Sequence, residues 1–87
     1  MPTLSQLRNH LARAVYSLPF SGDLVKDVVL KNQSFQIHLK PRVPYGYIAD
    51  LTRRLEDIEN VVLSGIDTSP TEILIRGHFK PPFPNSY

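Results

Sequence analysis

Apolar residues near the start of the chain recur every three or four positions, as on one face of a helix. They are Leu4, Leu7, Leu11, Ala14, Val15 and Leu18. Thr3 and Gln6 can form a capping box at the start of this helix, and Pro19 ends it because proline disfavours helical geometry in the preceding residue. A second stripe with this spacing predicts a helix over 45–58: Tyr47, Ile48, Leu51, Leu55 and Ile58.

Four other segments have the composition of strands. "LVKDVVLK" at 24–31 and "VVLSGI" at 61–66 are rich in β-branched residues. The segments 34–40 and 71–79 alternate between apolar and polar positions, which is typical of a sheet with one buried face. We expect a loop at 19–23, a tight turn at Asn32-Gln33 and a turn at 67–70.

The two halves of the chain resemble each other. "QIHLKP" at 36–41 and "RGHFKP" at 76–81 place His, Lys and Pro at matching positions, forty residues apart. The same shift brings Leu11 onto Leu51 and Val15 onto Leu55, whereas the "VVL" at 28–30 matches that at 61–63 with a shift of thirty-three. Both halves have the order α-β-β, which indicates two copies of one unit, over about 3–40 and 44–80.

One such unit cannot bury its own apolar face, but two side by side can form a four-stranded sheet with both helices on one face. The predicted fold is therefore an α+β two-layer sandwich, α-β-β-α-β-β, in the arrangement called swapped ferredoxin-like. Residues 1–80 form its single domain and 81–87 a proline-rich tail. Alternation places Phe35, Ile75 and Phe79 in the core. We expect the opposite, uncovered face to carry the interaction residues Gln36, His38, Lys40, Leu74, Arg76, His78 and Lys80.

Composition narrows the range of functions. A chain of 87 residues without cysteine has no disulfide, thiolate zinc site or thiol nucleophile. No apolar run reaches the ~20 residues that span a bilayer, and the N-terminus lacks the pattern of a signal peptide. We therefore expect a cytoplasmic protein, unless the chain is a domain excised from an anchored periplasmic protein. The sequence contains no glycine-rich phosphate loop, nucleophile elbow or Ser/His/Asp arrangement, so we expect neither enzymatic activity nor a cofactor.

The expected uncovered face has two possible chemistries. His38 and His78 hold equivalent places and could come near each other, but zinc needs three or four ligands and no carboxylate is patterned beside them. We therefore expect no metal site. The basic residues Lys40, Arg76, His78 and Lys80 could contact phosphates of nucleic acid. The face lacks the exposed aromatic rings on which sheet-based RNA readers stack bases, which favours a protein partner instead.

Aromatic residues outside the repeat core form a second candidate surface. Tyr45, Phe83 and Tyr87 lie at its margin or in the tail, beside prolines. Exposed aromatic rings are common contact residues, and small cores gain stability by dimerising. The alternative is that these rings close one end of the core.

The segment "IADLTRRLEDIENVVLSGIDTSPTEILIRGHF" at 48–79 resembles the α-β-β units of the inner-membrane assembly proteins of type IV pili and type II secretion. The resemblance rests on "LTRRL", the Val-Val-Leu strand and "ILIRG" at 73–77, and reaches the first half only through the repeat. It implies a duplicated, swapped ferredoxin-like scaffold that dimerises without catalysis. Those proteins carry a transmembrane helix and a coiled coil before this domain, and this chain has neither.

Together these observations predict a non-catalytic module for protein–protein interaction or assembly, with a second copy of the chain as the expected partner. The alternative is a small RNA- or DNA-binding domain that uses the basic uncovered face.

Overall fold

A computed structural model describes residues 4–80 of the chain. Its elements, in chain order, are α1 (Leu4–Ser17), α2 (Ser21–Leu24), β1 (Val25–Lys31), β2 (Ser34–Leu39), α3 (Tyr45–Glu56), β3 (Val61–Thr68) and β4 (Ile73–Phe79). The predicted proline-rich tail lies outside the described residues, as do Phe83 and Tyr87.

The four strands form one sheet in the order β1-β2-β4-β3, and every neighbouring pair is antiparallel. The last strand along the chain is therefore inserted beside β2, while β1 and β3 are the edges. Both edge strands carry a bulge, at Lys26 in β1 and at Ser64 in β3. Bulges of this kind interrupt the regular edge that another strand would otherwise pair with.

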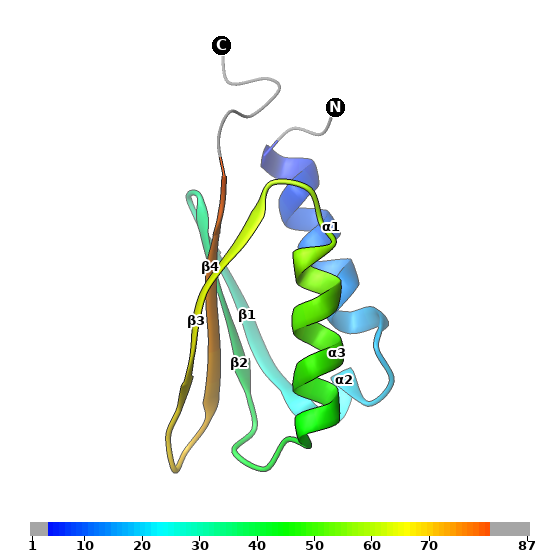
Figure 1. The fold of residues 1–87 in the computed structure, drawn as a ribbon, viewed down its shortest axis with the longest axis vertical. Helices are drawn as coiled ribbons and strands as arrows, with labels where there is room; N and C mark the ends of the chain where they lie inside the picture. Colours follow the sequence, from blue (N-terminus) through cyan, green and yellow to red (C-terminus); the bar gives the residue numbers. More distant parts are fainter. Residues whose placement is uncertain (1–3, 81–87) are drawn as a thin grey trace.

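The helices α1 and α3 lie side by side on one face of the sheet (Figure 1). The core between these layers is built from the apolar stripes read from the sequence. From the helices it takes Leu7, Leu11, Val15, Leu51 and Leu55, and from the strands Phe35, Ile37, Leu39, Ile73, Ile75 and Phe79. The α+β class, the four-stranded sheet and the placement of Phe35 and Phe79 in the core are confirmed. Their two rings lie tilted against each other, 5.6 Å apart between centroids.

The segment between α1 and β1 differs from the expected loop over 19–23, because residues 21–24 form the short helix α2. Ser21, which begins α2, is 1% exposed and anchors this segment through its side chain. Its hydroxyl donates to the carbonyl of Val15 at 2.6 Å and is hydrogen-bonded to the Tyr47 hydroxyl at 2.7 Å. These bonds tie the end of α1 to the start of α3. Phe20, just before α2, has a φ of 69° and an exposed side chain.

The remaining differences concern element bounds. The predicted turn at Asn32-Gln33 is confirmed, with Asn32 at a φ of 55°. Strand β3 runs to Thr68, two residues past the predicted end, because its pairing with β4 continues to the Thr68–Ile73 pair. The helix α3 ends at Glu56 rather than 58, since the chain must turn at Asn60, whose φ is 69°, to enter β3.

Candidate functional site

One face of the sheet lies away from the helices, and no helix or strand covers it among the residues that the structure describes. We call this the open face. Strand alternation assigns to it the side chains of Asp27, Val29, Lys31, Ser34, Gln36, His38, Val62, Asp67, Leu74, Arg76 and His78. Ser64 joins them through the bulge, because its hydroxyl is hydrogen-bonded to Nδ1 of His78 at 3.3 Å. The predicted open-face residues in strands thus share one surface. Lys40 and Lys80 directly follow β2 and β4, and both are exposed.

The two histidines do not form a pair. His38 lies opposite Leu74 and His78 lies opposite Ser34, so the two are offset by four residues along antiparallel neighbours. At 3.3–3.4 Å per residue this offset is about 13 Å. The expectation that they could approach each other is therefore wrong, because β2 and β4 are antiparallel and the two histidines fall at opposite ends of the pair. Within residues 4–80, no group of three or more His, Asp or Glu side chains could hold a metal ion.

A carboxylate does lie beside His38, contrary to the sequence analysis. Glu72, just before β4, accepts a hydrogen bond from Nδ1 of His38 at 3.0 Å, and its other oxygen lies 3.3 Å from Nζ of Lys26. The hydrogen bond from His38, and then that from Lys26, lower the pKa of Glu72 below its ordinary value. Glu72 therefore carries its negative charge on the open face across the neutral pH range.

The open face is also not uniformly basic. Nε of Arg76 donates to Oδ2 of Asp67 at 2.8 Å. Asp67 comes from β3, where the sequence analysis expected a turn, and the longer strand brings it next to Arg76. The predicted cationic surface is thus corrected to a surface of mixed charge. Because both side chains are about half exposed, this ion pair adds little stability, in the range of 0–1 kcal/mol.

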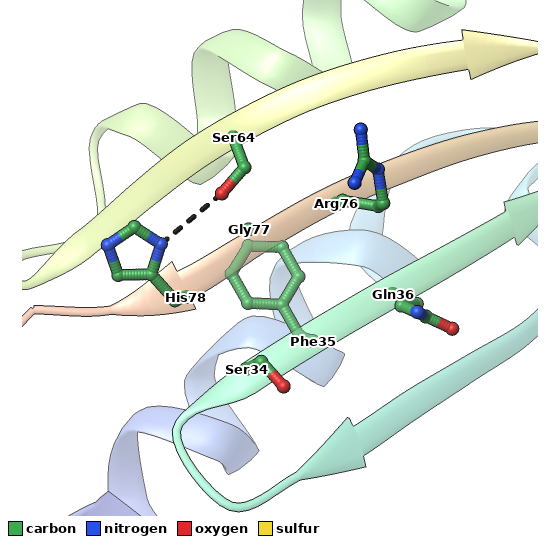
Figure 2. A pocket seen from close by; sticks show the side chains of 7 residues that line it. All are labelled: Ser34, Phe35, Gln36, Ser64, Arg76, Gly77 and His78. Atoms are coloured by element: carbon green, nitrogen blue, oxygen red, sulfur yellow. Dashed lines mark hydrogen bonds between the residues drawn. The ribbon is translucent and has the colours of Figure 1, made fainter.

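A hollow of about 280 Å³ lies on the open face between β2, β4 and β3 (Figure 2). Its polar lining consists of Ser34, Gln36, Ser64, Arg76 and His78, over a floor formed by Phe35 and Gly77. Every one of these five side chains can donate a hydrogen bond, and none is a carboxylate. We call it the donor hollow. A second hollow of about 260 Å³ shares Ser34, Phe35 and Gln36 with it and adds Val29 and Lys31 of β1.

Charge is therefore segregated along the strands. The donor hollow and Lys31 lie at the end where β2 begins and β4 ends, at the top of Figure 1. We call this the donor end, and Lys80 follows it directly. The three carboxylates of the face, Asp27, Asp67 and Glu72, lie toward the opposite end, which we call the acidic end. Lys26 and Lys40 lie there as well, so the acidic end is mixed but retains more carboxylates than cations.

The aromatic margin is described only in part. Tyr45 begins α3 and is 89% exposed, so it does not close the end of the core. Tyr16 and Phe20 are also exposed, toward the end of the helix layer at which α3 begins. These two were not predicted as interaction residues from the sequence, although the position of Phe20 next to Pro19 was a signal that could have identified it.

Comparisons with protein-family models, with curated proteins and with solved structures found no match for this chain. Neither long helix among residues 4–80 combines the length and the apolarity that crossing a lipid bilayer requires.

Proposed function

We propose that this protein is a non-catalytic assembly module that associates with a second copy of itself through the open face. The observation that carries the proposal is the asymmetry of the sheet. Two helices bury one side, while the other side presents half-buried apolar residues among polar ones. Two of its carboxylates are paired within the chain, Glu72 with Lys26 and His38, and Asp67 with Arg76.

The apolar part of the open face consists of Val29, Val62 and Leu74, from the strands β1, β3 and β4. None of the three belongs to the core or packs against it. Protein contact surfaces typically combine apolar side chains with polar side chains. A polar group that is already hydrogen-bonded within its own chain costs less free energy to remove from water than an unpaired charge does.

The area of the open face indicates how strongly two copies should associate. Four strands at about 4.8 Å spacing and about 7 residues at 3.3 Å each give roughly 450 Å². Two copies together would bury on the order of 900 Å², which is below the range of stable complexes and within that of transient ones. We therefore expect weak association, favoured at high protein concentration.

Sedimentation equilibrium of the 87-residue chain, extended to about millimolar concentration, tests this proposal. We expect the mean mass to rise above that of the monomer. The Leu74→Ser variant should associate more weakly, since the two copies each lose an apolar contact at the interface. Tyr16→Ser, which changes an exposed aromatic residue of α1, is the matched control and should leave the association unchanged. A strict monomer over the whole range would remove the proposal.

The topology of the sheet and the matching halves of the chain fit this proposal. The strand order β1-β2-β4-β3 with antiparallel neighbours supports a ferredoxin-like sheet whose chain starts one strand later. The matching burial of Leu11 with Leu51, and of Val15 with Leu55, supports an origin by duplication. The resemblance to the assembly domains of pilus and secretion systems fits the same proposal, because it implies dimerisation without catalysis.

The second candidate function is nucleic-acid binding, favoured by the donor hollow with Lys31 and Lys80 nearby. The pairing of Arg76 with Asp67, and the carboxylates at the acidic end, weaken it. Titration of a labelled oligonucleotide at two salt concentrations decides: phosphate contacts require an affinity that falls steeply with salt. The absence of binding at low salt would exclude this function.

A further inference from the structure

The donor hollow is a polar depression whose lining can donate hydrogen bonds but offers no anionic acceptor. Arg76 uses Nε for Asp67, which leaves the outer edge of its guanidinium for a second acceptor. Ser34, Gln36, Ser64 and His78 line the same hollow as Arg76, from the strands β2, β3 and β4 (Figure 2), and Lys31 lines the adjoining hollow. A group that complements such a lining is an oxyanion, because it accepts several hydrogen bonds and carries the opposite charge.

The same face carries acceptors of this kind at its acidic end. Glu72 and Asp67 are carboxylates on the open face, and each is held in place by an ion pair. Oxyanion and donors are thus present on one surface but at opposite ends of its strands. Within one copy, Arg76 and Asp67 meet at 2.8 Å, but Glu72 lies four residues before Arg76 in the chain, about 13 Å away along an extended backbone, and cannot reach the donor hollow of its own copy.

We propose that the donor hollow is a carboxylate-binding site, and that a second copy of the chain fills it with the carboxylates of its acidic end. This inference rests on the self-association proposed above. The two copies are then related by a two-fold axis that lies between the faces and runs perpendicular to the strands. This axis turns the second copy end for end, so each donor end lies over the other copy's acidic end. Both contacts form at once, as a two-fold interface requires.

The other two-fold arrangement of the same faces is disfavoured by charge. An axis parallel to the strands places donor end on donor end and acidic end on acidic end, so that like charges oppose each other. The two arrangements predict opposite effects of salt. Association through opposite charges weakens as salt screens them, whereas association against like charges strengthens.

Charge reversal tests the assignment. Arg76→Glu places an anion in the donor hollow, and Glu72→Lys places a cation at the acidic end. Each variant alone should weaken dimerisation about tenfold, because the two-fold axis repeats every altered contact. The variant that carries both changes should recover most of the loss, since the opposite charges meet again with their signs exchanged. Arg53→Glu, an exposed reversal on α3, is the matched control and should have no effect.

Sedimentation equilibrium at two salt concentrations is the readout, with thermal unfolding of each variant to confirm that it is folded. Weaker association of both single variants, recovery in the double variant and weakening of the wild type by salt support the proposal. Wild-type association that resists both reversals, or that salt strengthens, would overturn it while leaving self-association intact.

Two further results would separate failure of this inference from failure of the proposed function. A wild type that stays monomeric at every concentration would remove the proposed function together with this inference. Binding of a phosphate-bearing oligonucleotide that Arg76→Glu abolishes would instead assign the donor hollow to phosphate and overturn its assignment to a carboxylate.

Discussion

Gly77 provides the sharpest test of how the sheet and its hollow are built. It lies in β4 directly opposite Phe35 of β2, with its missing side chain on the helix-covered face. A Cβ placed there would lie 2.6 Å from the Val62 carbonyl oxygen and 2.7 Å from Cε2 of Phe35, and closer still to Cζ of the same ring. The ring therefore occupies the space that any other residue at position 77 would need.

The expected cost of Gly77→Ala follows from these contacts. Forcing a methyl group into a packed core costs about 1–3 kcal/mol, and the backbone carbonyl cannot rotate away. Alanine recovers part of this, because glycine in a strand is less favourable by about 0.5–1 kcal/mol. We expect a net loss of about 1 kcal/mol in the free energy of unfolding, which corresponds to roughly 4–8 °C in Tm for a domain of this size.

Urea unfolding followed by far-ultraviolet circular dichroism measures this difference. Gly65→Ala is the control, since a Cβ there would meet only Nη2 of Arg76, at an ordinary 3.6 Å. It should be neutral or stabilising. A double-mutant cycle with Phe35→Leu isolates the ring, and the cost of Gly77→Ala should fall by about 1 kcal/mol in that background. Two results would show that the Phe35 ring does not exclude a side chain at position 77. One is a loss of unfolding free energy for Gly77→Ala that is no larger than for Gly65→Ala. The other is an equal loss for Gly77→Ala whether residue 35 is Phe or Leu.

Two other predictions concern hydrogen bonds. Hydrogen bonds from His38 and Lys26 lower the pKa of Glu72, so its contribution to stability is present above its unfolded pKa and is lost as pH falls through the lowered folded value. Urea midpoints of wild type and Glu72→Gln, measured between about pH 7 and about pH 3, should converge only at the acid end; a constant difference would contradict this. Ser21→Ala removes a buried hydroxyl bonded to Val15 and Tyr47. It should cost about 1–3 kcal/mol, against little for the exposed Ser17→Ala, and equal costs would refute the role given to Ser21.

Much of the architecture was readable from local pattern. A stripe every three or four residues and an alternation of two report which side chains face the core, because those periods are set by backbone geometry alone. Leu11, Leu51, Phe35 and Phe79 were therefore assigned to the core from their spacing, and all four are fully or almost fully buried.

The contacts within the candidate site could not be predicted from the local sequence pattern. Its charge balance depends on Glu72 and Asp67, which were expected to lie at the start of a strand and in a turn. They reach His38 and Arg76 because β4 lies between β2 and β3 in a particular register. Register is a long-range property, and no period within a strand reports it.

The sequence by itself determined the two long helices, the four strands and the buried side of each, since local sterics and the need to bury apolar surface act within a few residues. Only the tertiary structure decided which side chains meet on the open face. Antiparallel pairing separates the two histidines, joins each to a different partner and collects the hydrogen-bond donors at one end of the sheet. Those contacts join residues as far apart as His38 and Glu72, and their geometry exists only once the chain has folded.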